Sequence, residues 1–293
     1  MSTPAQPAPA YRFDLFYQIH ARYPQPALFT LKDHRYYRAF ADEAGTLALV
    51  SIHADAKGLH IIPLVGTIPE AHIQHVLGMH TDLIAFYAFA QQTPPLWSVV
   101  RDLAGLPLYR SETLYEALIF VIIEQHIAWR NAQRAQRLLV EWGGHSITAG
   151  GVTCYAMPTP QQLAQATLDD LKPLKITFQR MRLLIAIAER FADDPHTFTD
   201  VLHDAKALYE RLLTIKGVGH WTASVVMARA LGAYHYIPHN DVALQAAVAT
   251  YFDVEKSSVA TRTIFEEYGE FGGLASHFTL MRWVLDRYPV VNG

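Results

Sequence analysis

The segment Lys216-Gly217-Val218-Gly219-His220 places two glycines around a small apolar residue, directly before a run with helical spacing. Glycine permits a positive φ and lets another backbone approach closely. A tight turn of this kind leaves the first N–H groups of the next helix pointing outward. Together with the helix dipole, they form a site suited to an anion such as a phosphate. Phosphate binding by Gly217, Gly219 and Thr222 is one interpretation, and an ordinary glycine corner between helices is the other.

Asp241 stands at the predicted start of a later helix, directly after Tyr236-Ile237-Pro238-His239-Asn240, where the proline prevents the earlier helix from continuing. A carboxylate held near a sugar carbon can stabilise an oxocarbenium-like transition state, and it can orient or deprotonate water. An aspartate in this place is also a typical helix N-cap. Taken alone, the position favours the cap.

Together, the glycine hairpin and the aspartate resemble the helix–hairpin–helix DNA glycosylases, in which a Gly/Pro-rich loop ends in a catalytic aspartate. The sequence is similar to the inducible bacterial 3-methyladenine DNA glycosylases in particular. The similarity lies in the order Ile-Lys-Gly-Val-Gly-His-Trp-Thr-Ala and in the position of Asp241, twenty residues after Trp221. Residues 106–119 with Glu124-Gln125-His126 resemble that family's leading helix and wedge loop. The resemblance covers residues 80–285 well and the first part of the chain weakly.

The resemblance implies a monofunctional hydrolase that releases alkylated purines, such as 3-methyladenine or 7-methylguanine, from double-stranded DNA, with Asp241 as the catalytic carboxylate. Relatives that also cut the strand carry a lysine two residues after the second hairpin glycine. That position is Trp221 here, and Lys216 does not match it. Trp221 and Trp283 would instead line the pocket of a flipped, positively charged base. Packing in the core is the alternative for both.

The resemblance also implies a wedge and an ion. The family fills the gap left by a flipped base with a side chain from the wedge loop, where Gln125 and His126 stand here; a solvent-exposed loop residue is the alternative for His126. The family binds a monovalent cation through hairpin carbonyl groups, which would be those of Leu213, Ile215 and Val218. No other cofactor is required.

Charge and composition limit where DNA could bind. Among the 293 residues there are 24 Lys plus Arg and 27 Asp plus Glu, a formal net charge of −3, so DNA would have to meet a local basic patch. Each basic residue could equally belong to a solvated face. The histidines at 72, 75 and 80 are only a weak metal motif. The basic candidates are Lys172, Lys175, Arg180 and Arg182, and Arg130, Arg134 and Arg137.

A single cysteine, Cys154, excludes a disulfide within the chain and a four-cysteine metal site. The first ten residues have no features of a signal peptide, and no apolar run reaches the roughly 18 residues of a membrane span. This composition favours a cytoplasmic protein that does not bind membranes. The resemblance implies a bacterial-type monomer that acts at the nucleoid.

The predicted fold class is α+β and mainly α, with a helix–hairpin–helix glycosylase domain after a small β-rich antiparallel domain. The expected division is a flexible tail over 1–10, the β-rich domain over 11–68 and the helical domain over 69–293. Periodicity predicts strands at 11–19, 35–41, 46–53 and 58–65. It predicts helices at 70–79, 127–142, 178–191, 206–215, 220–231, 242–251 and 274–288.

Three other functions remain open. The first is a glycosylase for oxidised or deaminated bases, because the shape of the pocket decides between lesions. The second is a non-catalytic helix–hairpin–helix module that only binds DNA, against which Asp241 argues. The third is a helical scaffold or small-molecule protein in which the glycines and the aspartate are purely structural.

Overall fold

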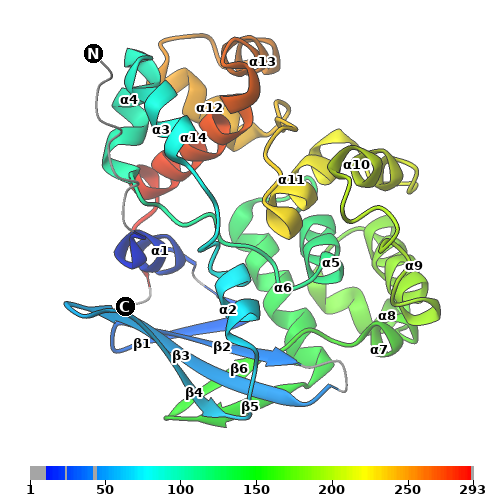
Figure 1. The fold of residues 1–293 in the computed structure, drawn as a ribbon. Helices are drawn as coiled ribbons and strands as arrows, with labels where there is room; N and C mark the ends of the chain where they lie inside the picture. Colours follow the sequence, from blue (N-terminus) through cyan, green and yellow to red (C-terminus); the bar gives the residue numbers. More distant parts are fainter. Residues whose placement is uncertain (1–10, 24, 42–44, 292–293) are drawn as a thin grey trace.

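The computed structural model describes residues 11–23, 25–41 and 45–291. The flexible tail predicted over residues 1–10 lies outside the described residues. The described chain combines a small antiparallel sheet with two groups of helices, which confirms the predicted α+β, mainly helical fold class (Figure 1). None of the described helices is both long enough and apolar enough to cross a membrane.

The sheet consists of four antiparallel strands that neighbour one another in chain order. It lies at the bottom of the molecule in Figure 1. The strands predicted over 35–41 and 58–65 have those bounds, whereas the one predicted over 46–53 spans 47–55. The short first strand has no counterpart in the sequence analysis. The bounds are β1 (Phe29–Lys32), β2 (Arg35–Ala41), β3 (Leu47–Asp55) and β4 (Gly58–Val65).

The strand predicted over residues 11–19 is wrong, because Phe13–His20 forms a helix, α1. The segment alternates aromatic and polar residues, but its apolar residues also recur at helical spacing. Phe13, Phe16 and His20 lie on one buried stripe. Nδ1 of His20 donates to the carbonyl oxygen of Phe16 at 2.8 Å, and burial lowers the pKa of this imidazole to about 4. The ring is therefore neutral within an aromatic cluster at neutral pH.

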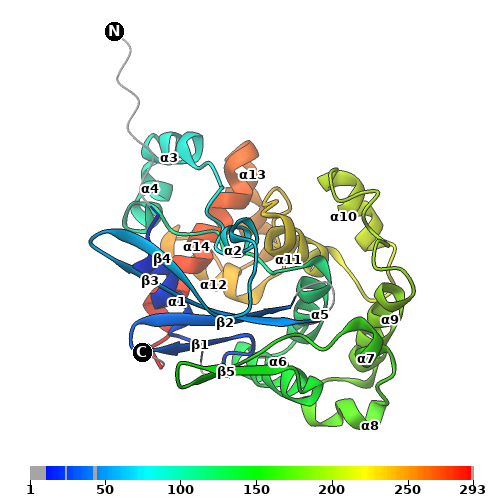
Figure 2. The ribbon, with the colours of Figure 1, turned by 60° about the horizontal axis from the view of Figure 1, so that its bottom comes forward.

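A second hairpin, β5 (Ser146–Ala149) and β6 (Val152–Tyr155), completes the β layer from within the helical part of the chain. Strand β6 packs on β1 and β2, and β5 packs on β3. Figure 2 shows the green strand β5 close to the blue strands of the sheet. Residues from both layers are buried together, among them Leu49, Val152 and Cys154. The predicted domain limit at residue 68 falls between β4 and the helix α2 (Glu70–Val76), and the division into domains stays a prediction.

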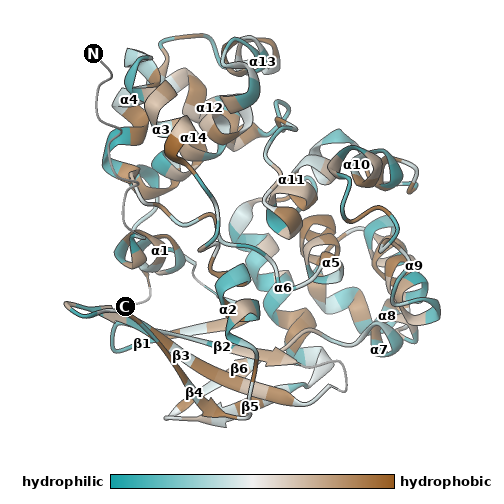
Figure 3. Ribbon diagram, in the orientation of Figure 1, coloured by the Kyte–Doolittle hydropathy of each residue, from teal (hydrophilic) through white to brown (hydrophobic). Residues whose placement is uncertain are grey.

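The first group of helices surrounds α5 (Leu114–Glu124), which is almost wholly apolar and buried (Figure 3). Thr113 caps α5 by accepting the N–H of Glu116, as expected for a threonine at an N-cap. The helix predicted over 220–231 is observed with those bounds. The other members are α6 (Trp129–Gly143), α7 (Pro160–Ala164), α8 (Leu168–Leu171), α9 (Phe178–Asp193), α10 (Ala205–Leu213) and α11 (His220–Leu231).

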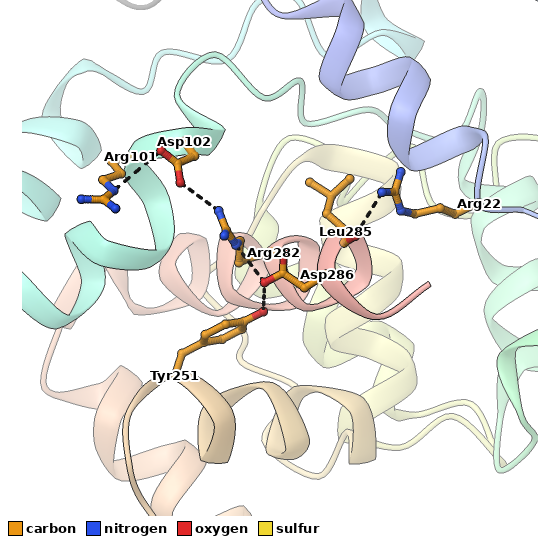
Figure 4. A network of polar contacts seen from close by, with 7 residues as sticks. All are labelled: Arg22, Arg101, Asp102, Tyr251, Arg282, Leu285 and Asp286. Atoms are coloured by element: carbon orange, nitrogen blue, oxygen red, sulfur yellow. Dashed lines mark hydrogen bonds and ion pairs between the residues drawn. The ribbon is translucent and has the colours of Figure 1, made fainter. Parts of the chain in front are cut away.

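The second group has its own core and includes elements from both ends of the chain. A polar network fixes its last helix on its neighbours (Figure 4). Arg282 donates to Asp102 at 3.0 Å, and Asp286 accepts from Arg282 and from the hydroxyl of Tyr251 at 2.7 Å. The members are α1, α3 (Ile84–Gln91), α4 (Pro94–Val100), α12 (Val242–Tyr251), α13 (Ser258–Glu266) and α14 (Gly272–Arg287).

A buried ion pair joins the sheet to the first group of helices. Nη2 of Arg38 on β2 donates to Oε2 of Glu116 on α5 at 2.8 Å, and the two residues are 6% and 4% exposed. Oε2 of Glu112 lies 3.7 Å from the same nitrogen. Burial lowers the pKa of the Arg38 guanidinium, but Glu116, Tyr36 and Glu112 together raise it by more, so the group stays charged.

Glu116→Gln should lower the free energy of unfolding by about 3 kcal/mol, because it leaves the buried charge of Arg38 poorly compensated. Urea unfolding measures this change. The matched control is Glu210→Gln, since the Glu210 side chain is 64% exposed and lies 3.9 Å from Lys206. The control should change stability by less than about 0.5 kcal/mol. Equal losses in the two variants would show that the buried pair does not hold the sheet in place.

Candidate active site

The hairpin between α10 and α11 uses its two glycines differently. Gly217 has a φ of +97°, and a Cβ there would lie 2.9 Å from Cδ2 of Leu183. Gly219 has a φ of −101°, and a Cβ there would meet no atom within 4 Å. Only the first glycine therefore needs the left-handed region, whereas the second keeps the surface in front of α11 open.

Helix α11 begins without a side-chain cap. Its first backbone bond runs from the N–H of Ala223 to the carbonyl oxygen of Gly219. Among the described residues, nothing accepts the N–H groups of residues 219–222, and Gly219 itself is exposed. Unpaired N–H groups at the positive end of a helix dipole form an anion site. Thr222 contributes its N–H to this set, but its hydroxyl is buried and accepts from Gln125 at 2.9 Å.

Asp241 is both the N-cap of α12 and the partner of a tryptophan. Its Oδ1 accepts the N–H of Leu244 at 2.8 Å, which confirms the capping interpretation. Its Oδ2 accepts the indole N–H of Trp221, also at 2.8 Å. The carboxylate is half-buried. One fixed donor on each oxygen holds the group in a single orientation, so capping and a catalytic role are compatible.

The two predicted pocket tryptophans have different surroundings. Trp221 is half-buried against the first helical core. Trp283 belongs to a row of half-buried rings, in which it lies 5.7 Å from Tyr288, which lies 4.8 Å from Trp129. Trp129 in turn lies 5.0 Å from Tyr23. Trp221 is not part of this row. The sequence analysis missed Trp129 and Tyr288, although Trp129 begins the helix directly after the predicted wedge loop.

The end of α5 and the wedge loop that follows it are bound to the hairpin and to α11. The Gln125 side chain donates to the carbonyl oxygen of Gly217 at 3.0 Å as well as to Thr222. Glu124 accepts from Arg229 at 2.7 Å. His126, by contrast, is exposed and has a φ of +51°. Of the two predicted wedge residues, Gln125 binds the hairpin, whereas His126 is exposed on the wedge loop.

The prediction that Arg180 contacts a DNA phosphate is wrong, because its side chain is buried. It is 8% exposed, and its Nη1 donates to the carbonyl oxygens of Ile123 at 3.2 Å and Gln125 at 2.6 Å. The guanidinium therefore binds one carbonyl group in the last turn of α5 and the carbonyl group of the residue that follows the helix, where backbone partners are lacking. The sequence showed a basic residue near other basic residues, but it did not show which way the side chain points.

The other basic candidates divide into paired and available side chains. Lys172 pairs with Asp169 at 2.7 Å, and Arg137 pairs with Glu141 at 2.6 Å. Arg130 and Arg182 are exposed. One surface hollow beside the wedge loop is lined by a residue from each of the two predicted basic groups, Arg134 and Lys175. It is lined by Ile127, Asn131, Arg134, Leu174 and Lys175.

The carbonyl groups predicted to hold a cation have few hydrogen-bond partners, and the cation itself stays a prediction. Among the described residues, nothing donates to the oxygens of Leu213 and Val218, and the oxygen of Ile215 accepts only the N–H of Val218 at 2.9 Å. Carbonyl oxygens with free lone pairs suit a hard cation. The described residues with metal-ligand geometry are His53, Asp55 and His60 on the β3–β4 hairpin, and not the histidines at 72, 75 and 80.

No family model matches the chain. The fold is similar to that of a 3-methyladenine DNA-glycosylase from Archaeoglobus fulgidus, with a TM-score of 0.79 and 22% identity over 95% of this chain and 96% of that chain. It is also similar to an 8-oxoguanine glycosylase/lyase of Clostridium acetobutylicum solved with double-stranded DNA, with a TM-score of 0.67 and 17% identity over 88% and 97% of the chains. The protein has the fold of the helix–hairpin–helix DNA glycosylases.

Proteins with similar sequences are named as one kind of DNA glycosylase. A DNA-3-methyladenine glycosylase of Bacillus subtilis is 29% identical over 174 residues, which are 59% of this chain and 57% of the relative. A second Bacillus subtilis protein, named a putative DNA-3-methyladenine glycosylase, is 26% identical over 187 residues, 64% of this chain and 60% of the relative. The chain thus matches less than two thirds of each relative's length. These matches confirm the resemblance to 3-methyladenine DNA glycosylases that the sequence predicted.

Substitutions at the two glycines should separate folding from binding. Gly217→Ala should lower the free energy of unfolding by about 1–2 kcal/mol, because alanine is strained at a positive φ. Gly219→Ala should fold normally but weaken binding to damaged and undamaged duplexes by the same factor, since it places a methyl group over the proposed phosphate site. Thermal unfolding and fluorescence anisotropy measure the two effects. Unchanged affinity of a folded Gly219→Ala protein would mean that this surface does not face DNA.

Proposed function

We propose that the protein is a monofunctional DNA glycosylase that hydrolyses the N-glycosidic bond of alkylated purines in double-stranded DNA. The observation that carries the proposal is the Asp241 carboxylate, fixed by Leu244 and Trp221 next to the open N-terminus of α11. A helical scaffold needs no such pairing of an anion site with an oriented carboxylate. The names of the sequence relatives support alkylated purines as the substrate class.

The proposed reaction begins with the DNA backbone. The N–H groups at the start of α11 bind a phosphate, which positions the duplex without reading its sequence. His126, exposed on the wedge loop, enters the gap as the damaged nucleotide turns out of the stack. The Asp241 carboxylate then faces the sugar carbon, where it stabilises the positive charge that develops as the bond breaks. The base departs with the bonding electron pair, and a water molecule adds to the sugar carbon and gives up a proton to Asp241 or to solvent, which leaves an abasic site.

Alkylated purines suit a site with a single identified carboxylate. Such a base carries a formal positive charge, so its glycosidic bond is weak and the leaving group needs little protonation. An aromatic face attracts a cation with up to about 2 kcal/mol when water is excluded. The half-buried row of Trp283, Tyr288 and Trp129 and the separate Trp221 both offer such faces.

Two further features belong to the proposal. Trp221 occupies the place where the strand-cutting relatives have their lysine, so no Schiff base with the sugar is expected there. A monovalent cation held by the carbonyl groups of Leu213, Ile215 and Val218 would supply positive charge close to the bound phosphate. The hollow that contains Arg134 and Lys175 would add contacts to other phosphates of the duplex.

A panel of lesion duplexes tests the function as a whole. Under single-turnover conditions, 7-methylguanine and 3-methyladenine should be released faster than hypoxanthine or 8-oxoguanine. The abasic strand should stay intact until hot alkali is added, and borohydride should trap no protein–DNA adduct. A known 8-oxoguanine glycosylase/lyase is the positive control for trapping. Faster release of 8-oxoguanine would overturn the substrate class, and an efficient adduct would overturn the monofunctional mechanism.

Asp241→Asn should reduce base release by about 10²-fold or more, because the amide has no charge to stabilise the oxocarbenium-like transition state. Affinity for the duplex should change little. The matched control is Asp204→Asn, because Asp204 caps α10 through the N–H groups of Lys206 and Ala207. Release at the wild-type rate by the Asp241 variant would reduce this residue to a helix cap.

A further inference from the structure

His220, the first residue of α11, forms hydrogen bonds through both ring nitrogens. Nε2 lies 2.7 Å from the carbonyl oxygen of Ile237, and Nδ1 lies 2.6 Å from the hydroxyl oxygen of Tyr209. A carbonyl oxygen can only accept, so Nε2 carries the proton. In the neutral ring, Nδ1 then accepts the proton of the Tyr209 hydroxyl. These two contacts select one tautomer and one orientation of the imidazole.

Ile237 begins the short segment that ends in Asp241. The carbonyl oxygen of Ile237 also accepts the N–H of His239 at 2.8 Å, and the N–H of Asp241 donates to the carbonyl oxygen of Pro238 at 2.8 Å. Trp221, the residue after His220, donates to the carboxylate of Asp241. Two consecutive residues of α11 therefore hold the segment of residues 237–241 at its two ends. His220 binds its first carbonyl group, and Trp221 binds the side chain of its last residue.

Aromatic contacts extend this arrangement on both sides. The ring of Tyr209 stacks on that of Tyr236, with centroids 3.7 Å apart and an angle of 3° between the planes. The ring of His239 lies 4.7 Å from that of His220, and its Nε2 accepts from Arg262 at 2.7 Å. Burial and then the Arg262 charge lower the pKa of His239, so no cationic imidazole stands beside His220 at neutral pH.

We propose that His220 is a positioning residue that fixes the Asp241 carboxylate relative to the phosphate-binding start of α11. The inference rests on the proposed glycosylase function, in which the phosphate and the carboxylate act on one nucleotide at the same time. The anion site is built from N–H groups at the start of α11, and the carboxylate belongs to Asp241, the N-cap of α12. His220 spans the two, because its own N–H lies in the anion site and its ring holds Ile237.

Loss of the imidazole should therefore affect the chemical step more than binding. In a reaction that depends on alignment, misplacement of a group by about 1 Å can cost about 10²-fold in rate. Phosphate contacts use the backbone of α11, which His220→Ala leaves in place. His220→Gln should recover most of the rate, since its amide can donate to Ile237 and accept from Tyr209.

The experiment compares His220→Ala, His220→Gln and Tyr209→Phe with the control His203→Ala, a histidine exposed on the surface. Single-turnover release of 7-methylguanine and the Kd for a duplex with a tetrahydrofuran abasic analogue are measured for each. His220→Ala should lose about 10²-fold in rate with less than about threefold change in Kd. Tyr209→Phe should lose less, and His203→Ala nothing. Wild-type rates in the His220 variants, or equal losses in rate and affinity without recovery in His220→Gln, would overturn the proposal.

A second measurement does not depend on activity. The hydrogen exchange of the Trp221 indole N–H, assigned by its absence in Trp221→Phe, reports the bond to Asp241. His220→Ala should speed this exchange, whereas His203→Ala should leave it unchanged. Unchanged exchange in His220→Ala would refute the positioning role even if no substrate has been found. If wild-type protein releases no base from any duplex while His220→Ala speeds the exchange, the proposed function fails and the structural role of His220 stands.

Discussion

The hydrogen bond between the Trp221 indole and the Asp241 carboxylate connects the two groups of helices, each of which has its own core. Helix α11 contributes Ala223, Val226 and other residues to the first helical core, while α12 contributes Leu244 and Val248 to the second. The bond therefore crosses from one core to the other. Because the two N–H donors to the carboxylate come from different cores, its orientation depends on how the two groups of helices are fixed to each other.

Contacts on both sides of this hydrogen bond fix the helices that carry Trp221 and Asp241. The network of Arg282, Asp286 and Tyr251 holds α12, the helix that Asp241 caps, on α14. On the other side, Gln125 binds both the hairpin backbone and Thr222, and Arg180 binds the end of α5. The wedge loop and the hairpin are thus one connected unit. The proposed reaction, in which the site binds a phosphate, opens the duplex and presents a carboxylate, would require such fixed distances.

The β layer supports the site indirectly. Its ion pair between Arg38 and Glu116 reaches α5, the helix whose end carries the wedge loop. The hairpin β5–β6 comes from the chain between α6 and α7 and packs on the sheet, so the helical part and the sheet share one buried layer. Removal of the sheet would expose that layer and leave Glu116 without the cation of Arg38.

Local spacing in the sequence was enough to predict the bounds of β2, β4, α11 and α12, the capping position of Asp241 and the glycine hairpin. It failed for α1, where alternation and helical periodicity coincide in one short aromatic segment. The hydrogen-bond partners of the polar side chains could not be predicted and are given only by the tertiary structure. Arg180 and Gln125 are 55 residues apart, and Gln125 and Thr222 are 97 apart. Backbone preferences act over a few residues, whereas these contacts depend on how distant helices pack, which no local pattern encodes.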